Sequence, residues 1–305
     1  MDYILQTNAL CKKYGKIQVL NDLTMNVPRG SIYGFVGKNG AGKTTLIRII
    51  CGLQYQDEGD LIICGVKNTD TKINNVRRKL GAIVETPSLH LNMTAKENVL
   101  LQLNVLGIRD DEGRTDELLE FVGLSDTGKK LVTNFSLGMK QRLAIAIALC
   151  GNPKFIVLDE PINGLDPQGI IDMRDLLNKI NKERQITILI SSHILDELSK
   201  IATHYGFIAN GKIVAEMSAE ELAASSQKCM TLTLDKIVNI EKAMETFENT
   251  YEVVNETTVV VHGDIIVTDL ILALHKYGIA VHRLIDEEES LEERFFGLLG
   301  GVTND

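Results

Sequence analysis

The sequence predicts an α/β core followed by a smaller α+β domain, and three observations support that fold class. A glycine-rich turn lies between an apolar run at residues 31–36 and an apolar helical stretch at residues 44–51, which is a strand-loop-helix order. Two further β-rich runs, residues 154–158 and 186–190, end in polar side chains, as strands of a buried parallel sheet often do. After residue 217, short strand and helix patterns follow in the order β-α-β-β-α-β.

The composition and length are typical of a globular protein. At 305 residues the chain is long enough for roughly two domains, and it contains 44% hydrophobic and 24% charged residues. No apolar run approaches the roughly 18 residues of a membrane helix, and residues 1–16 lack a signal-peptide pattern. Five widely spaced cysteines without a C-x-x-C pair predict neither a disulfide framework nor a zinc site. We therefore expect a soluble cytoplasmic protein, and a net charge of −9 argues against a nucleic-acid groove.

The glycine-rich turn reads G-K-N-G-A-G-K-T-T over residues 37–45 and matches the phosphate-loop pattern G-x-x-x-x-G-K-T. Backbone without Cβ atoms can curl so that successive N–H groups point at phosphate oxygens. Because a helix follows the turn, the phosphates would lie at a helix amino terminus, where unpaired N–H groups and the helix dipole favour anions. The residues expected to bind a nucleotide here are Gly37, Asn39, Gly40, Gly42, Lys43, Thr44 and Thr45.

Two side chains of this loop have distinct expected tasks. Lys43 can reach the β and γ phosphates of a bound nucleotide, which also makes it a catalytic candidate. The Thr44 hydroxyl is a hard oxygen ligand of the kind that Mg²⁺ prefers. The loop therefore predicts a nucleoside triphosphate and Mg²⁺ as ligands.

A pair of carboxylates, Asp159 and Glu160, ends the run at residues 154–158. At the end of a buried strand, Asp159 would join the Mg²⁺ shell and Glu160 would orient or deprotonate an attacking water. An acidic turn without chemistry is the alternative. The run at residues 186–190 ends in S-S-H, which places His193 at the same sheet edge, where ligands bind in open α/β sheets.

Five motifs occur in an order that is typical of one protein family. They are G-K-N-G-A-G-K-T-T at 37–45, S-L-G-M-K-Q-R at 136–142, I-V-L-D-E-P at 156–161, N-G-L-D at 163–166 and S-S-H at 191–193. Over about residues 2–217 the chain resembles the nucleotide-binding subunit of an ATP-binding cassette (ABC) transporter. The resemblance implies a P-loop NTPase core with a β-rich amino-terminal part and a helical subdomain that carries the second motif. It also implies that ATP is bound and hydrolysed with Mg²⁺.

In this family two domains pair head to tail, and each ATP lies between the phosphate loop of one and the second motif of the other. The resemblance implies that a helix beginning near Met139 faces the partner's ATP. It also implies an aromatic side chain stacked on adenine, although a surface aromatic in the K-K-Y-G-K turn is the alternative. The contacts with ATP or with the partner implied in this way involve Tyr14, Ser136, Gly138, Asp166 and His193.

Two departures from the family pattern indicate a branch. Glu85 stands where the family usually has glutamine, and its place favours a contact with Mg²⁺ or its water; an ordinary loop acid is the alternative. Leu137 and Met139 replace the usual Gly and Gln of the second motif. These features resemble the ATPases that serve bacitracin and lantibiotic export or self-immunity. The resemblance thus implies export of a peptide antibiotic or a related amphiphile.

The resemblance also implies partners. The chain would pair with itself or with a paralogous ATPase subunit, and the dimer would drive a separately encoded membrane permease from the inner face of the cell membrane. A non-transport ABC ATPase acting on ribosomes or DNA is the alternative. The ribosomal kind normally carries two cassettes and the DNA-repair kind carries coiled coils or zinc motifs, neither of which occurs in this sequence. The substrate, the direction of transport and the choice between homodimer and heterodimer stay open.

The chain divides into three expected parts. Residues 1–217 would form the ABC ATPase domain, with a mostly helical subdomain at about residues 86–152. Residues 218–228 would be a linker, and residues 229–305 an accessory α+β domain of the ferredoxin-like type.

Local patterns add detail to two of these parts. In the helical subdomain, Thr94 and Glu97 match a capping box, which predicts a helix start. In the accessory domain, the acidic run at residues 286–293 predicts a solvated helix face. Apolar side chains would form a cleft for a helix of the membrane subunit, or else core, at Leu89, Leu91 and Met93. A last helix would pack on the tail or on a partner through Leu291, Phe295, Phe296 and Leu299.

Overall fold

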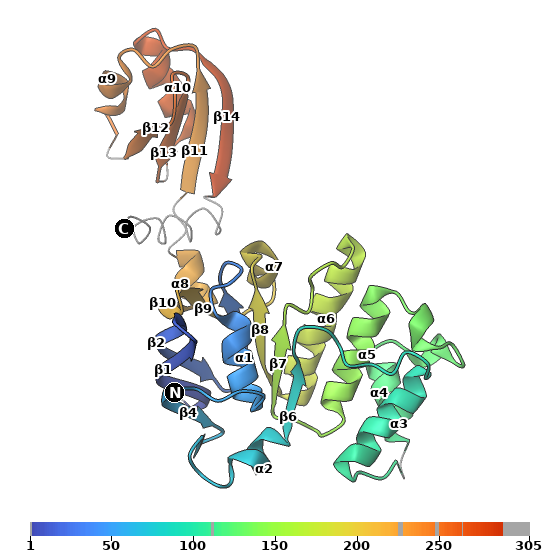
Figure 1. The fold of residues 1–305 in the computed structure, drawn as a ribbon. Helices are drawn as coiled ribbons and strands as arrows, with labels where there is room; N and C mark the ends of the chain where they lie inside the picture. Colours follow the sequence, from blue (N-terminus) through green and yellow to red (C-terminus); the bar gives the residue numbers. More distant parts are fainter. Residues whose placement is uncertain (1, 111–112, 225–227, 248–249, 264, 289–305) are drawn as a thin grey trace. The chain divides into compact units, whose positions relative to one another are not determined.

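The computed structural model describes residues 2–110, 113–224, 228–247, 250–263 and 265–288 (Figure 1). The chain divides into two compact units, Met1–Ala219 and Glu220–Asp305. Within the described residues, no helix has both the length and the hydropathy that crossing a bilayer requires. Each unit has its own hydrophobic core.

A six-stranded sheet forms the centre of the first unit, in the order β10-β9-β3-β8-β7-β6. The pairs among β9, β3, β8, β7 and β6 are all parallel, and β10 adds an antiparallel edge. Because every residue of β3, β7 and β8 is buried, these strands read as the continuous apolar runs typical of a parallel sheet. The bounds are β3 Ile32–Val36, β6 Leu80–Ile83, β7 Phe155–Asp159, β8 Thr187–Ser192, β9 His204–Ala209 and β10 Lys212–Ser218.

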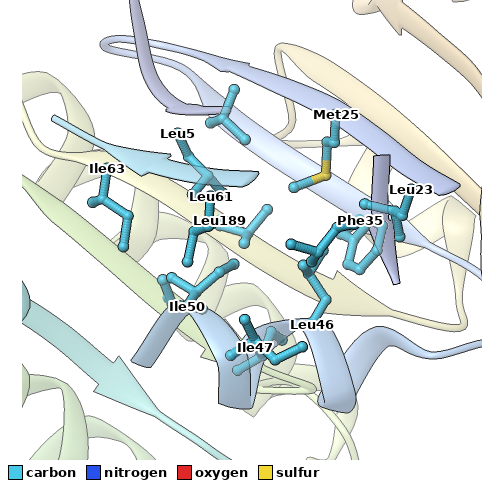
Figure 2. Packing of buried hydrophobic residues seen from close by; sticks show 14 of the residues in the cluster. Leu5, Leu23, Met25, Phe35, Leu46, Ile47, Ile50, Leu61, Ile63 and Leu189 are labelled. Carbon is cyan, nitrogen blue, oxygen red and sulfur yellow. The ribbon is translucent and has the colours of Figure 1, made fainter. Parts of the chain in front are cut away.

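A second, antiparallel sheet faces the central one across a single helix, α1 (Lys43–Cys51). Its order is β2-β1-β4-β5, with bounds β1 Tyr3–Tyr14, β2 Ile17–Pro28, β4 Glu58–Ile63 and β5 Val66–Lys67. Side chains of α1 join the same buried cluster as side chains of both sheets (Figure 2). Completely buried members include Leu5, Met25, Phe35, Leu46, Ile47, Ile50, Leu61, Ile63 and Leu189. This cluster fixes α1, and with it the turn that precedes the helix.

The first unit contains six further α-helices in its described residues, α2 Ile73–Arg77, α3 Ala95–Leu106, α4 Arg114–Phe121, α5 Leu137–Leu149, α6 Pro167–Arg184 and α7 Leu195–Ser199. Helix α8, Ala219–Ala224, begins at the boundary between the two units. The capping box at the start of α3 is confirmed, because Glu97 N donates to Thr94 Oγ1 and Thr94 N donates to the Glu97 carboxylate. Leu91, ahead of α3, is 48% exposed and is therefore not part of the core, whereas Leu89 and Met93 are half-buried.

The 18-residue helix α6 is the longest in the described chain and was not predicted. Its start carries two recognisable signals, since Asp166 is the N-cap and Pro167 occupies the first turn. Its far end holds α4: the ring of Phe121 has Lys179 Nζ and Arg184 Cζ each 4.3 Å from its centroid. Arg184 also donates to Glu117 Oε1 at 2.6 Å. Helix α6 thus connects the N-G-L-D motif with the helical subdomain.

The second unit is a four-stranded antiparallel sheet in the order β12-β13-β11-β14 with two helices. In chain order these strands are the second, third, first and fourth, which gives the ferredoxin-like arrangement and confirms the fold-class prediction. The bounds are β11 Lys228–Leu234, α9 Ile240–Met244, β12 Tyr251–Val253, β13 Thr258–His262, α10 Val267–Lys276 and β14 Val281–Glu288.

The described start of the acidic run, residues 286–288, differs from its prediction, and residues 289–293 lie outside the described residues. Asp286, Glu287 and Glu288 continue strand β14 rather than forming a helix, because they pair with Met230, Cys229 and Lys228 of β11. Hydrogen bonds between β14 and β11 therefore stabilise a strand where the charge pattern predicted a helix. The predicted helix with Leu291, Phe295, Phe296 and Leu299 lies outside the described residues.

Candidate functional site

The turn between β3 and α1 has the geometry of an anion-binding loop. Gly40 and Gly42 adopt φ values of 83° and 112°, the left-handed region in which a side chain is strained. Gly42 is the N-cap of α1 and has no side chain that could accept a hydrogen bond from the first turn of this helix. The first amides of α1 are therefore left for an external anion.

Close packing holds the backbone of this loop in place. A Cβ atom at Gly37 would lie 2.6 Å from the carbonyl oxygen of Ile208, and one at Gly42 would lie 2.7 Å from Leu20 Cδ2. The loop thus rests on strands β9 and β2 without room for a methyl group at either glycine. Asn39 is exposed at the tip, Thr44 is half-buried in the first turn of α1, and Thr45 is buried.

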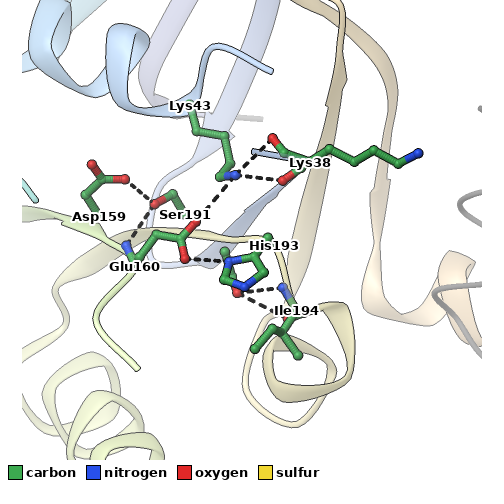
Figure 3. Close-up of polar contacts among 9 residues, drawn as sticks. Lys38, Lys43, Asp159, Glu160, Ser191, His193 and Ile194 are labelled. Atoms are coloured by element: carbon green, nitrogen blue, oxygen red, sulfur yellow. Dashed lines mark hydrogen bonds and ion pairs between the residues drawn. The ribbon is translucent and has the colours of Figure 1, made fainter. Parts of the chain in front are cut away.

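Lys43 turns back into the loop that precedes it. Its Nζ donates to the carbonyl oxygens of Gly37 at 2.6 Å and Lys38 at 3.3 Å (Figure 3). The same Nζ lies 3.4 Å from Glu160 Oε1, and the Lys43 side chain is only 6% exposed. A buried ammonium is therefore fixed at the mouth of the loop, with a carboxylate as its partner.

Asp159 and Glu160 stand at the carboxyl end of β7 and are fixed by its neighbour β8. Ser191 Oγ donates to Asp159 Oδ1 at 2.6 Å and accepts from the Glu160 backbone N at 2.9 Å. Asp159 is 3% exposed, whereas the Glu160 side chain is 23% exposed. Glu160 has a φ of 49°, so the chain turns sharply directly after the buried acid. Sequence reasoning did not assign Ser191 a role.

His193 follows β8 and completes the cluster. Its Nδ1 lies 2.6 Å from Glu160 Oε2, so the two oxygens of that carboxylate face Lys43 and His193 respectively (Figure 3). The structure therefore brings Lys43, Asp159, Glu160 and His193 together at the carboxyl ends of three adjacent strands, β3, β8 and β7. This edge is where ligands bind in open α/β sheets.

The second glycine motif lines a different pocket. A cavity of about 350 Å³ is bounded by Ser136, Gly138, Arg142 and Asp166, among others, and none of its lining residues comes from the phosphate loop. Helix α5 begins at Leu137 rather than near Met139, because the Ser136 hydroxyl accepts from Met139 N and acts as the N-cap. Asp166 caps α6 by accepting from Gly169 N at 3.3 Å.

The backbone at Gly138 is not closely packed against the rest of the chain. A Cβ atom there would meet only Leu165 Cδ2, at an ordinary 3.8 Å. Neither its burial nor its packing within this chain explains a glycine, unlike the case of Gly37. The space next to Gly138 would therefore hold a Cβ atom without displacing a neighbour.

Two predicted site residues stand apart from the central cluster. Tyr14 is 43% exposed at the end of β1, and its hydroxyl donates to Gln54 Oε1 at 2.6 Å. Glu85 has a φ of 60°, and its carboxylate is paired with Arg48 of α1 rather than with any member of the cluster. The contacts of Arg48 with Glu85 and of Gln54 with Tyr14 were not predicted. For Arg48 the sequence offered one signal, because it lies one helical turn after Thr44 and therefore on the same side of α1.

The oxygen atoms available at this site suit Mg²⁺, which shares its ligands between protein, phosphate and water, better than a metal ion that is bound by protein side chains alone. Among the described residues, no group of three or more His, Cys, Asp or Glu side chains is close enough to bind a metal ion. Mg²⁺ is usually held by one or two protein oxygens together with substrate phosphates and waters. The buried carboxylate of Asp159 and the hydroxyl of Thr44 are hard oxygen donors of this kind.

Comparison with known proteins identifies the family. The ABC transporter family model matches residues 20–163. The chain is 41% identical over 308 residues to the bacitracin transport ATP-binding protein BcrA of Bacillus licheniformis, covering 99% of both chains. It is 43% identical over 213 residues to the lantibiotic transport ATP-binding protein SrtF of Streptococcus pyogenes, covering 70% of this chain and 90% of that protein.

A solved structure shows the same fold with reaction products bound. The ATP-binding cassette MJ0796, solved as a dimer in a post-hydrolysis state with ADP and Pi, superposes with a TM-score of 0.63 at 28% identity. The match covers 70% of this chain and 98% of that one. The phosphate loop, the paired carboxylates and these relatives together show that the chain belongs to the ABC transporter family, as an ATP-binding subunit similar to the bacitracin and lantibiotic transport proteins.

Proposed function

We propose that this subunit hydrolyses ATP in a head-to-tail dimer, with itself or a paralogue, and thereby drives a separately encoded membrane permease. One observation carries the proposal: the two motifs that recognise phosphate lie in separate sites of one chain, the loop before α1 and the 350 Å³ pocket at the start of α5. A Cβ atom at Gly138 would meet only Leu165 Cδ2, at 3.8 Å, so packing within the chain does not require a glycine there. When two chains pair head to tail, the phosphate loop of each chain lies opposite the second glycine motif of the other chain.

In the proposed site the phosphates lie at the uncapped amino end of α1, and Lys43 faces the β and γ phosphates. Lys43 is already desolvated and oriented by two carbonyl oxygens, so little reorganisation is needed when an anion arrives. Thr44 and Asp159 are the residues that would hold Mg²⁺, and Ser191 keeps the Asp159 carboxylate in one orientation. When bound, Mg²⁺ supplies positive charge that neutralises the phosphate oxygens.

Glu160 is the proposed general base, and His193 positions it. One oxygen of the Glu160 carboxylate contacts His193 Nδ1, and the other lies near Lys43 Nζ. These two contacts restrict the side chain to few rotamers, so the carboxylate keeps one orientation toward an attacking water. The ring of His193 is 33% exposed, so it can meet the γ phosphate from the same side. Tyr14 is the proposed adenine contact, with its ring held by Gln54.

The proposed cargo is a peptide antibiotic of the bacitracin or lantibiotic type, exported from the cell. This part rests on the relatives, which are named for bacitracin and lantibiotic transport, and on Glu85 in place of the usual glutamine. In the proposed cycle Glu85 approaches Mg²⁺ or its water, which requires it to leave Arg48. The exposed Leu91 and the half-buried Leu89 and Met93 are proposed to receive a helix of the permease at the inner face of the membrane.

The dimer is tested by mixing two inactive variants. Lys43→Ala disables the phosphate loop, and Ser136→Arg disables the second motif. In a head-to-tail dimer the mixed species has one intact composite site, so mixing should restore about a quarter of wild-type turnover. If both motifs acted within one chain, the mixture would stay as inactive as its parts. Lys67→Ala, on a surface strand, is the control that should keep full activity.

The transport role is tested by co-purification and resistance. The tagged chain should co-purify with a multi-helix membrane protein, and co-expression of the pair should raise the bacitracin concentration that a sensitive host tolerates. Lys43→Ala should abolish the resistance and keep the complex. Recovery on ribosomes or DNA without a membrane protein would instead support the non-transport alternative.

A further inference from the structure

A second cavity lies at the end of the parallel sheet opposite to the nucleotide site. It has a volume of about 610 Å³, and Phe155 and Leu80, the first residues of β7 and β6, form part of its lining. Strand β7 runs from Phe155 to Asp159, so about 13 Å of strand separates this cavity from the buried acid of the nucleotide site. It is therefore distinct from both phosphate-recognising motifs.

The floor of the cavity is apolar. Phe155 is buried, and Val66, Val76 and Leu80 are half-buried around it. The lining comes from four places in the chain, namely strand β5, helix α2 and the starts of β6 and β7, which all belong to the first unit. Figure 1 shows α2 beside the lower end of β6. A volume of this size falls in the range that holds a small organic ligand.

The rim of the cavity is positively charged. Lys72, Lys79 and Lys154 line it, no acidic residue does, and all three are exposed. In the part of the chain that the structure describes, no ion pair involves any of these lysines. The stretch from Val66 to Leu80 contains five basic residues and one acidic residue, whereas the whole chain carries a net charge of −9. The cavity therefore gathers positive charge on an acidic protein.

We propose that this cavity binds a small amphiphilic anion, a free carboxylate attached to an apolar chain. The apolar body lies on Val66, Val76, Leu80 and Phe155, where it is removed from water. The carboxylate lies at the rim, within reach of the three ammonium groups, which are otherwise left without a counter-charge. An apolar floor with a few convergent polar groups is the usual construction of a small-molecule site.

The charge pattern selects this class over its alternatives. A neutral amphiphile would use the floor and leave the lysines unpaired, and a cationic one would be repelled by them. A free inorganic anion would use the rim and leave the apolar floor in water. Only a ligand with both an apolar chain and an anionic group contacts both the floor and the rim of the cavity. The residues that line this cavity include none from the phosphate loop or from the pocket at α5.

The test is a calorimetric titration of the full-length protein with laurate below its micellar concentration. Laurate should bind at one site, whereas 1-dodecanol and dodecyltrimethylammonium, which share its chain, should bind at least about tenfold more weakly, which corresponds to about 1.4 kcal/mol. Saturating ATP should leave the laurate affinity unchanged. Equal binding of dodecanol, or displacement of laurate by ATP, would overturn the proposal.

Two variants with the same net charge distinguish the effect of the rim lysines on laurate binding from the effect of the protein's net charge. The rim variant, Lys72→Gln, Lys79→Gln and Lys154→Gln together, should weaken laurate binding about tenfold or more. The control carries the same loss of charge elsewhere, with glutamine at Arg29, Lys96 and Lys200, each of which pairs with an acid and none of which lines the cavity, and it should bind as wild type does. Both should keep the wild-type melting temperature and ATPase turnover. Equal affinity in the two variants would refute the site.

Discussion

The most direct test of the proposed chemistry is Glu160→Gln. Glutamine has the shape of glutamate and can keep a polar atom 2.6 Å from His193 Nδ1, but it cannot accept a proton from water. It also removes the negative charge that lies 3.4 Å from Lys43 Nζ. We therefore expect the geometry of the site to survive and only the general base to be lost.

The size of the effect follows from general-base catalysis. A positioned base contributes about 10²–10⁴ in rate, which at about 1.36 kcal/mol per tenfold is about 2.7–5.4 kcal/mol of barrier. Glu160 is held at both oxygens, so we expect turnover to fall by about 10² or more. ATP affinity should stay within about threefold of wild type or rise, because Lys43 loses a competing acid.

The assay is phosphate release at saturating Mg²⁺ and ATP, paired with a direct nucleotide-binding titration. Glu117→Gln is the matched control, since it removes the charge of a surface acid that pairs with Arg184, and it should leave turnover unchanged. Turnover of Glu160→Gln near the wild-type value, with ATP still bound, would refute the base assignment. A loss of ATP binding with the fold intact would show that Glu160 acts in binding and not in the chemical step.

Three further predictions use other parts of the first unit. Tyr14→Ala should weaken ATP binding about five- to tenfold through lost stacking, whereas Tyr14→Phe should keep the affinity, and equal losses in both would show that the hydroxyl on Gln54 matters instead. The backbone N–H of Thr94 lowers the pKa of Glu97 from 4.5, so this charge stabilises the fold above that pH and the benefit is lost as the pH falls through the lowered value. In thermal melts, wild type should therefore exceed Glu97→Gln at pH 7, and the gap should close in acid; a constant gap would contradict this reading. Burial raises the pKa of Cys51 to about 12, so iodoacetamide at pH 8 should spare Cys51 in the folded protein and label it in denaturant, as mass spectrometry of peptides would show.

The features that could be predicted from sequence are those whose cause is local. The phosphate loop, the acids after β7 and the histidine after β8 are each fixed by a few neighbouring residues and by the rule that strand ends meet at one sheet edge. The capping box at Thr94 and Glu97 is local in the same way. Such patterns survive folding because no distant partner is needed to define them.

The features that escaped prediction depend on register between distant segments. Two serines precede His193, and only the pairing of Ser191 with Asp159 across β8 and β7 decides which one holds the acid. The pairing of Glu85 with Arg48 depends likewise on how the loop after β6 passes α1. Helix α6 was missed for another reason: it is mostly polar, and its buried stripe is narrow, confined to Met173, Leu176, Leu177 and Ile180. The Asp166-Pro167 pair is nevertheless a start signal that can be read from the sequence.

Helix α6 also gives the first unit a mechanical property. With 18 residues it is a rod of about 27 Å, stiff along its length because every turn is hydrogen-bonded to the next. One end is tied to the pocket at α5 through Asp166, and the other grips the ring of Phe121 between two cations. We therefore expect a displacement of Asp166 to move α4 as well, because α6 contacts α4 at its other end.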